Sequence, residues 1–115
     1  MAEITAFDPQ QLIFLNEEWL ALGEAKISVL DRGFLFGDGV YEVIPVYARH
    51  PFRLLQHIER LNHSLAAISL ANPYDTDTWQ AIIWQTIACQ AAENQWVYIQ
   101  ITRGAAPRDL AFPSK

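Results

Sequence analysis

The sequence predicts an α+β fold, a mainly antiparallel sheet with two helices packed on one side. Strand-like segments occupy much of residues 11–47, two helical segments with apolar side chains every three or four residues follow, and a last strand-like segment lies at 96–102. With strands first, helices next and a strand last, both helices can cover the same face of one sheet. The 115 residues match the size of one domain and show no linker, so we expect a single domain over 1–115.

The first elements are expected to form a hairpin. Residues 11–15 have the composition of a strand, residues 16–18 supply a turn, and residues 19–22 form the returning strand. Residues 26–30 are expected to continue the sheet. The next nine residues, 31–39, contain three glycines and two aspartates and therefore predict a tightly shaped loop.

The segment 40–47 predicts a strand with two apolar faces. Its β-branched and aromatic side chains alternate, with Tyr41, Val43 and Tyr47 on one face and Val40, Ile44 and Val46 on the other. We expect such a strand to be covered on both sides. Pro45 has no N–H for the ladder, so the strand should lie at an edge or be bulged at this position.

The period then changes to that of a helix. A first helix is expected to end near residues 70–71, before an Asn-Pro pair, and its apolar stripe comprises Leu54, Ile58, Leu61, Leu65 and Ile68. Residues 75–77 can cap a second helix, with Gln80 three residues after Asp77 as in a capping box. Its core side is expected to carry Trp79, Ile82, Ile83, Thr86 and Ile87.

Composition and charge exclude several classes of function. The formal net charge is -5 and the basic residues form no run, so nucleic acid is not an expected partner. No signal sequence opens the chain and no apolar stretch approaches the roughly 20 residues that span a bilayer, so no membrane association is expected. Cys89 is the single cysteine, which indicates a reducing, cytoplasmic location. His57 and His63 have no third ligand nearby, so no metal site is expected.

The glycine-containing segment 31–39 leads directly into the strand that carries Tyr41. Its glycines permit positive φ angles or close backbone approach, and such a loop can present Tyr41 at the rim of the sheet. A tight turn that feeds a core tyrosine is the alternative. The spacing fits neither the dinucleotide-binding nor the P-loop pattern, and no helix is expected directly after it, so those phosphate loops are excluded.

Arg60 lies on the flank of the first helix, about 120° from the centre of the apolar stripe. No carboxylate lies three or four residues away, so its guanidinium must find a partner elsewhere or remain in water. A bidentate hold on a phosphate suits this planar group, and a solvated arginine is the alternative. An Arg60 turned away from any cleft and paired with a carboxylate of its own domain would contradict the phosphate interpretation.

Two more arginines, Arg103 and Arg108, flank a loop of small residues after the last strand. Together they can clamp an anionic group such as a carboxylate. A solvated loop with incidental charge is the alternative.

Three motifs occur in series, DRGFLFGDGVYEV at 31–43, HIERL at 57–61 and TRGAAPRD at 102–109. In this order and spacing they resemble the amino-terminal half of class IV (fold type IV) pyridoxal-phosphate aminotransferases, nearest to the D-alanine aminotransferase-like branch. The likeness covers residues 12–113. It implies the amino-terminal small domain of a two-domain, homodimeric enzyme that transfers an amino group between an amino acid, D-alanine-type favoured, and a 2-oxo acid.

The resemblance also implies roles by position. Arg60 matches the family's ligand for the phosphate of pyridoxal 5'-phosphate, and Tyr41 matches a tyrosine that helps bind the substrate carboxylate. Arg108 matches an arginine that reaches into the neighbouring subunit's site and completes the grip on that carboxylate. The histidine that D-alanine aminotransferases carry two residues later is replaced by Leu110, which donates no hydrogen bond and leaves the substrate open.

The resemblance places the lysine that binds the cofactor in a carboxy-terminal domain, beyond residue 115. Lys26 and Lys115 are the only lysines here and neither stands at that position, so no catalytic residue is expected and these 115 residues alone are expected to be inactive. Within the family, the alternatives are a branched-chain aminotransferase and an aminodeoxychorismate lyase. A further alternative is a truncated, non-catalytic module that dimerises or binds an anion.

Overall fold

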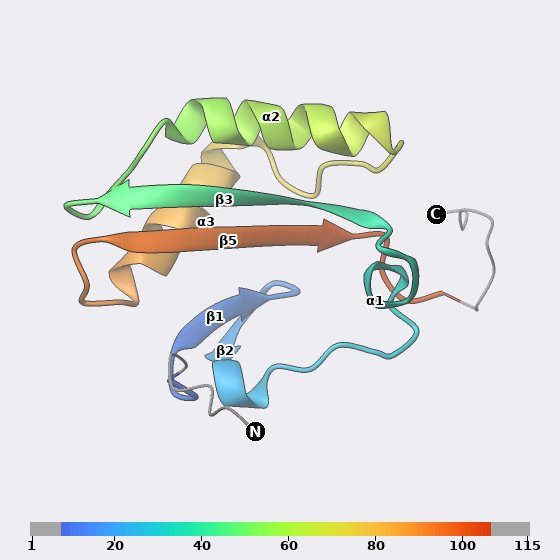
Figure 1. Ribbon diagram of the computed structural model, residues 1–115, viewed down its shortest axis with the longest axis horizontal. Helices are drawn as coiled ribbons and strands as arrows, with labels where there is room; N and C mark the ends of the chain where they lie inside the picture. Colours follow the sequence, from blue (N-terminus) through green and yellow to red (C-terminus); the bar gives the residue numbers. More distant parts are fainter. Residues whose placement is uncertain (1–7, 107–115) are drawn as a thin grey trace, which may run out of the picture.

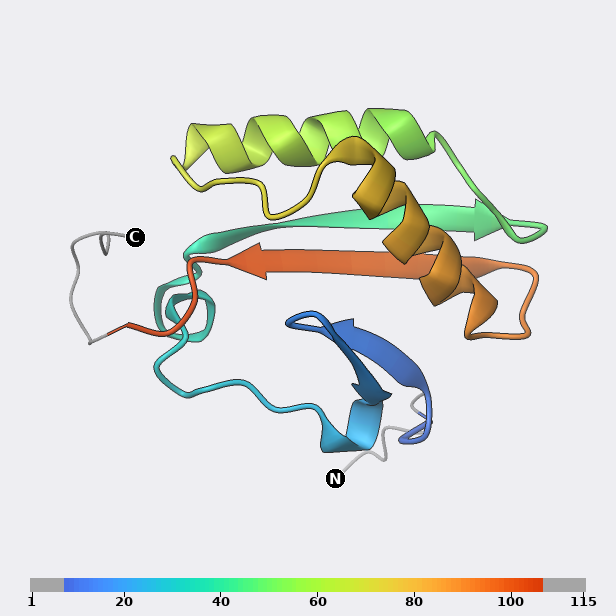
Figure 2. The same cartoon turned by 180° about the vertical axis from the view of Figure 1, so that it is seen from behind.

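The computed structural model describes residues 8–106, which form two antiparallel sheets and two long helices. A hairpin pairs β1 (Leu12–Leu15) with β2 (Glu18–Ala21), and the short 3-10 helix η1 (Leu22–Glu24) follows. The second sheet has the strand order β4 (His50–Pro51), β3 (Gly39–Tyr47), β5 (Gln95–Thr102). The helices α2 (Leu54–Ala67) and α3 (Thr76–Ala88) lie between β4 and β5 in the sequence. Figure 1 shows α2 running alongside β3, and Figure 2 shows α3 crossing the two long strands.

Both helices pack on the same face of the three-stranded sheet, which confirms the expected α+β fold. The core consists of side chains from α2, α3, β3 and β5, namely Ile44, Val46, Ile58, Leu61, Leu65, Trp79, Ile83, Ile87 and Val97. The expected stripes therefore lie inward, because residues three and four apart share one side of a helix. No helix within residues 8–106 has the length and apolarity needed to cross a membrane.

The hairpin confirms the expectation for the first strands. Asn16 and Glu17 form its two-residue turn with φ angles of 48° and 72°. Positive φ at both central positions matches the right-handed twist of the paired strands. The expected strand at 26–30 is wrong, because this segment is irregular and Ile27 and Val29 are exposed. Alternating apolar residues cannot form a strand where no neighbouring strand supplies hydrogen bonds.

The segment 31–39 contains a short helix that was not expected, α1 (Arg32–Phe36). Asp31 Oδ1 accepts a hydrogen bond from the Gly33 N–H at 2.8 Å, and Gly37 ends the helix at φ 64°. A Cβ on Gly39 would lie 2.5 Å from the Ile101 carbonyl oxygen. The glycines thus serve both expected purposes, positive φ and close approach.

Both long helices differ from expectation at one end. α2 ends at Ala67 instead of near 70–71, because Ser69 adopts φ 56° and the Leu70 N–H bonds the Leu65 carbonyl at 2.9 Å. α3 is capped from the expected segment 75–77, by Asp75, whose carboxylate accepts from the Thr78 N–H at 2.8 Å. The expected capping box between Asp77 and Gln80 does not form, because Asp77 already lies inside the helix.

The expectation that both faces of β3 are buried is wrong within the described residues, because only the face toward the helices is covered. We call the face opposite the helices the outer face; its exposed aromatic side chains are Tyr41, Tyr47, Trp96 and Tyr98. The expectation that the strand lies at an edge or is bulged at Pro45 is wrong, because β3 is the central strand and pairs with β5 in an unbroken register through this position. The Pro45 carbonyl accepts from the Phe52 N–H at 2.8 Å, so the position without N–H points toward β4 and costs no bond to β5.

Candidate functional site

The amino-terminal half of β3 carries candidate binding residues on both faces of the sheet, next to the edge of the strand that faces β4. Alternation directs Tyr41 to the outer face and Glu42 toward the helices. β4 pairs only with Val46 and Tyr47, so among residues 8–106 no strand lies beside the β4-side edge of β3 at Tyr41 and Glu42. Groups on both faces can therefore approach a ligand that lies along this edge.

Glu42 is a buried carboxylate that binds two side chains of α2. Its side chain is 4% exposed, Arg60 donates Nε to Oε2 and Nη2 to Oε1 at 2.9 Å each, and His57 Nδ1 lies 2.8 Å from Oε1. Burial raises the pKa of Glu42, but the hydrogen bonds from Arg60 and His57 outweigh it and hold the pKa below its usual value. The carboxylate is therefore ionised at neutral pH, and Glu42 raises the pKa of Arg60 in turn.

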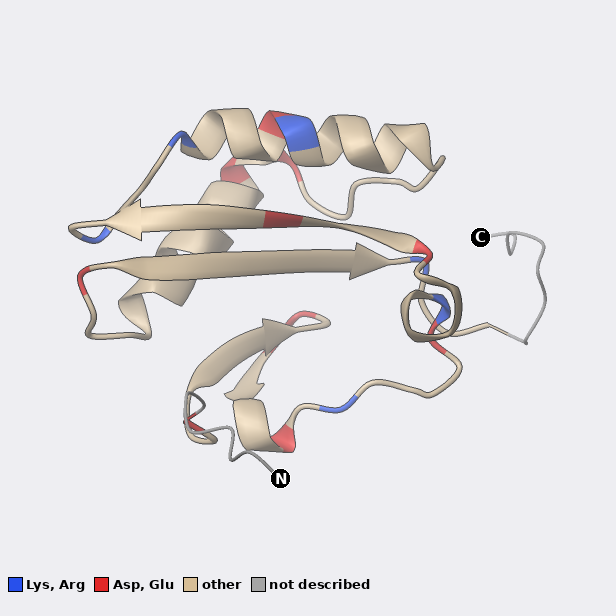
Figure 3. Ribbon diagram, in the orientation of Figure 1, with Lys and Arg blue, Asp and Glu red and all other residues tan. Residues whose placement is uncertain are grey.

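A surface depression of about 310 Å³ lies beside this pair and is lined by Arg53, Gln56, His57 and Arg60. These residues occupy the start and first two turns of α2, one above another at helical spacing. Figure 3 shows the charged positions on α2 and on the facing strand β3. The depression offers two guanidinium groups, an imidazole and an amide, which are the donor types that hold a phosphate.

The structure meets the expectation for Arg60 only in part. Arg60 is paired with a carboxylate of its own domain, which is one half of the arrangement that would contradict a phosphate ligand. It is not turned away from a cleft, because its side chain lines the depression and is 66% exposed. Its Nη1 makes no hydrogen bond within residues 8–106. The sequence did not indicate Glu42 as the partner, because it lies 18 positions earlier, beyond the reach of a helical pairing rule.

Tyr41 lies on the outer face with 64% of its surface exposed, so the alternative of a core tyrosine is wrong for the described chain. Its ring stacks on that of Tyr98, with 6.0 Å between the ring centroids. The Tyr98 hydroxyl donates to Gln100 Oε1 at 2.8 Å, and Gln100 is the cross-strand partner of Tyr41. A phenol hydroxyl and a primary amide therefore lie close to Tyr41 on one face.

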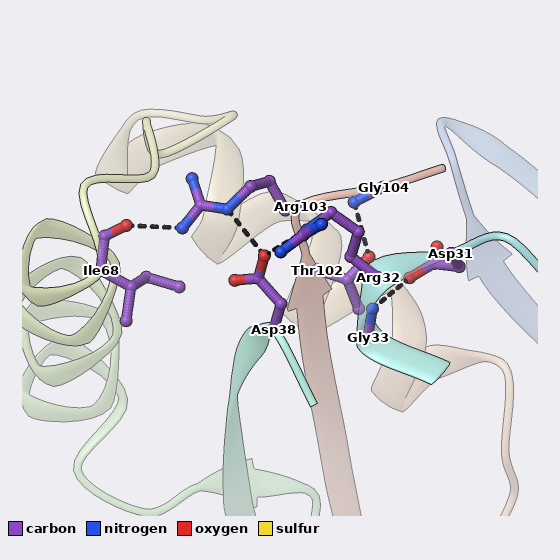
Figure 4. Close-up of polar contacts among 8 residues, drawn as sticks. All are labelled: Asp31, Arg32, Gly33, Asp38, Ile68, Thr102, Arg103 and Gly104. Atoms are coloured by element: carbon purple, nitrogen blue, oxygen red, sulfur yellow. Dashed lines mark hydrogen bonds and ion pairs between the residues drawn. The ribbon is translucent and has the colours of Figure 1, made fainter. Parts of the chain in front are cut away.

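Arg103, one of the two arginines expected to clamp an anion, is buried against its own domain instead of being solvated. Its side chain is 8% exposed, Nε donates to Asp38 Oδ2 at 2.9 Å and Nη2 donates to the Ile68 carbonyl at 2.6 Å (Figure 4). Arg108 and Leu110 lie outside the described residues, so the role expected for Arg108 stays a prediction. The Asp38 partner is 65 positions away in the sequence, and no local pattern indicates it.

The chain is similar in sequence and in fold to known proteins. Residues 39–115 match the family model for amino-transferase class IV. A D-alanine aminotransferase of Staphylococcus haemolyticus is 37% identical over 102 residues, which cover 89% of this chain and 36% of that protein. The solved T.th. branched-chain amino acid aminotransferase complexed with N-(5'-phosphopyridoxyl)-L-glutamate has a TM-score of 0.78 and 25% identity, covering 90% of this chain and 35% of that chain. The 4-amino-4-deoxychorismate lyase of Pseudomonas aeruginosa has a TM-score of 0.62 and 33% identity, covering 78% of this chain and 32% of that one.

The chain thus spans about a third of the length of these relatives. The family model covers more than half of the 115 residues, and it includes all of β3, α2, α3 and β5. The fold of the described residues agrees with the solved structures. Of the motifs that suggested the resemblance, the one at 31–43 extends through α1 into β3 and the one at 57–61 lies in α2 beside the depression. The chain belongs to the class IV aminotransferase family.

Proposed function

We propose that this segment is the amino-terminal small domain of a pyridoxal-phosphate-dependent aminotransferase of the D-alanine type. The whole enzyme would transfer an amino group between an amino acid and a 2-oxo acid, as a cytoplasmic homodimer. The 37% identity to a D-alanine aminotransferase supports the substrate class. The observation that carries the proposal is the exposed guanidinium of Arg60, held by a buried carboxylate at the rim of a cationic depression.

Arg60 is the proposed ligand for the cofactor phosphate. Two of its nitrogens are held by Glu42, which fixes the plane of the guanidinium before any ligand arrives. Arg53 and His57 line the same depression and can add donors, so the residues present fit a phosphate group. Pyridoxal phosphate, when bound, supplies a conjugated ring that withdraws electrons from the Cα atom of the amino acid.

Tyr41 and Arg108 are the proposed ligands for the substrate carboxylate, with Arg108 acting in the site of the neighbouring subunit. Tyr41 suits this role because it lies on the outer face at the open edge of β3, while Glu42 next to it faces the phosphate side. One strand thus separates the two anionic groups of the reaction by directing consecutive residues to opposite faces.

The experiment that tests these roles compares single variants of the whole enzyme. Arg60→Ala should weaken cofactor retention, because a charge-assisted donor to the phosphate is lost. Arg108→Ala and Tyr41→Phe should instead raise KM for the amino acid more than they affect cofactor binding. Cofactor dissociation constants and steady-state kinetics measure the two effects separately.

Matched controls are available on the same elements. His63→Ala truncates an exposed residue of α2, and Tyr47→Phe removes the hydroxyl of another exposed tyrosine of β3. Both controls should leave cofactor binding and KM unchanged. Equal effects of Arg60→Ala and Arg108→Ala on cofactor binding and on KM would contradict the proposal that the two arginines bind different anionic groups.

Leu110 is the observation that favours a second candidate within the family. It replaces a histidine of D-alanine aminotransferases, so a branched-chain aminotransferase or an aminodeoxychorismate lyase is the alternative. Activity of the whole enzyme on D-alanine, on branched-chain amino acids and on aminodeoxychorismate distinguishes the three.

We further propose that a polypeptide of these 115 residues alone does not transaminate and acts at most as an anion-binding or dimerising module. Lys26 lies in the irregular segment before α1, and within residues 8–106 no lysine lines the depression. Borohydride reduction in the presence of pyridoxal phosphate should therefore attach no stoichiometric cofactor to the 115-residue chain. A stoichiometric adduct at one lysine, detected by peptide mass spectrometry, would contradict this.

A further inference from the structure

A second cluster of charged side chains lies at the start of β3, at the end of the strand opposite to its turn with β4. It consists of Arg32, Asp38 and Arg103, and we call it the junction cluster. Asp38 Oδ2 accepts from Arg32 Nε at 2.8 Å and from Arg103 Nε at 2.9 Å (Figure 4). The three side chains are only 4%, 8% and 8% exposed. Buried ion pairs with aligned donors fix orientation, whereas apolar contacts permit sliding.

The junction cluster joins four parts of the domain. Arg32 opens α1, Asp38 immediately precedes β3, and Arg103 follows β5. Arg103 also donates Nη2 to the Ile68 carbonyl at the carboxyl end of α2. A single carboxylate and its two arginines therefore set the relative positions of two strand ends and two helices.

Backbone hydrogen bonds run in parallel with these side-chain contacts. The Arg103 N–H donates to the Asp38 carbonyl at 3.0 Å, and the Arg32 N–H donates to the Gly104 carbonyl at 2.8 Å. Ala105 forms an antiparallel bridge with Asp31. The chain that leaves β5 is thus held along the segment before β3 over residues 103–105, and its direction is defined before it reaches Pro107.

We propose that the junction cluster positions Tyr41 for its contact with the substrate carboxylate, which makes Arg32, Asp38 and Arg103 positioning residues for the reaction. The inference rests on the proposed function. Asp38 stands three residues before Tyr41. The cluster therefore lies at the start of the strand that carries Tyr41, and it fixes that start against the end of β5 and the end of α2.

Two buried arginines around one carboxylate are not required to stabilise the contact between these elements. Apolar side chains of similar volume often stabilise a fold as well as a buried ion pair does. An ion pair is favoured where a defined orientation matters, and small displacements of a binding group reduce the rate of reaction strongly. Because the cluster lies at the start of the strand that carries Tyr41 and none of its residues lines the Arg60 depression, we expect it to affect KM for the amino acid more than cofactor affinity.

The test uses Asp38→Asn in the whole enzyme, because asparagine keeps the shape and removes the charge. KM for the amino acid should rise about tenfold, and the cofactor dissociation constant should stay within about twofold. Asp38→Glu should recover part of the loss in KM, because it restores a carboxylate. If Asp38→Asn does not fold, Arg103→Lys replaces it, since lysine keeps the charge and loses the planar group.

The matched control is Arg49→Gln at the opposite end of β3. Arg49 donates to the carbonyl of Ile87 in the last turn of α3 and to those of Gln90 and Ala92 just after the helix, so its replacement removes comparable contacts far from the junction cluster. Arg49→Gln should lower Tm and leave KM unchanged. The proposal is overturned if Asp38→Asn changes Tm alone, as a merely structural residue would, or if cofactor affinity falls as much as KM rises. A wild-type enzyme without transaminase activity would instead refute the proposed function, and this inference with it.

Discussion

At the residue scale, Glu42 has the clearest consequence for the candidate site. It receives two bonds from Arg60 and one from His57 while its own side chain is almost fully buried. Arg60 itself is mostly exposed, and exposed ion pairs contribute little to stability because water screens them. The contact is therefore better explained as orientation of the guanidinium than as stabilisation of the fold.

This explanation predicts the effect of Glu42→Gln on the whole enzyme. A neutral amide cannot hold both donors of Arg60, so cofactor affinity should fall by roughly tenfold, the size of one lost charge-assisted hydrogen bond. The control is Glu59→Gln, which removes the same charge one position before Arg60 on the exposed side of α2. Fluorescence titration with pyridoxal phosphate measures both. Tighter binding in Glu42→Gln would mean that its charge repels the phosphate, and the orienting role would be wrong.

The sequence identifies individual anion-binding candidates better than their partners. Arg60 stands out because no carboxylate lies three or four residues away on its helix, and its partner in the structure does come from another element. Glu42 and Asp38 are not foreseeable as partners, since each pairs with arginines that come close only when β3, α2 and β5 assemble. Side-chain chemistry can be read from a motif, but a long-range ion pair depends on the packed structure.

At the element scale, periodicity predicts the elements that have buried faces. β3, β5, α2 and α3 carry strong apolar patterns and all four are expected from the sequence. The segment 26–30 misleads because its alternation is that of a strand although no partner strand is present among the described residues. α1 escapes prediction because five residues are too few to show a helical period. The exposed outer face of β3 shows that a pattern indicates an apolar surface without indicating what covers it.

The ion pairs of Asp38, where β3, β5 and α2 meet, predict that the free energy of unfolding depends on pH. Burial raises the pKa of Asp38, but hydrogen bonds and charges of Arg32 and Arg103 outweigh it, so the folded pKa lies below its usual value. A carboxylate with a lowered pKa stabilises the fold fully above the unfolded pKa and loses this contribution as pH falls toward the folded pKa. The free energy of unfolding should therefore fall with acid in this range.

Urea denaturation at successive pH values measures this dependence. Asp38→Asn should start from a lower stability at neutral pH, by about 3–5 kcal/mol if the pair behaves like other buried pairs that lose one partner. It should then lose less stability than the wild type on acidification, because one titrating carboxylate has been removed. Parallel pH curves for the two proteins would show that Asp38 does not carry the dependence.

At the scale of the whole molecule, one strand edge organises the proposed chemistry. The core lies on the helix side of the sheet, the aromatic outer face lies on the other, and β4 leaves the edge of β3 beside Tyr41 and Glu42 unpaired within the described residues. Of the proposed ligands within the described residues, Arg60 lies on the helix side of this edge and Tyr41 lies on the outer face. The central claim is therefore that phosphate and carboxylate are held by separate residues.

The most direct measurement compares binding of pyridoxal phosphate with binding of pyridoxal, which lacks the phosphate, by the wild-type enzyme and by Arg60→Ala. The wild type should bind the phosphorylated form more tightly, and Arg60→Ala should lose most of that preference, about ten- to hundredfold, while its affinity for pyridoxal stays nearly constant. An Arg60→Ala variant that retains the full preference for the phosphorylated form would contradict the account.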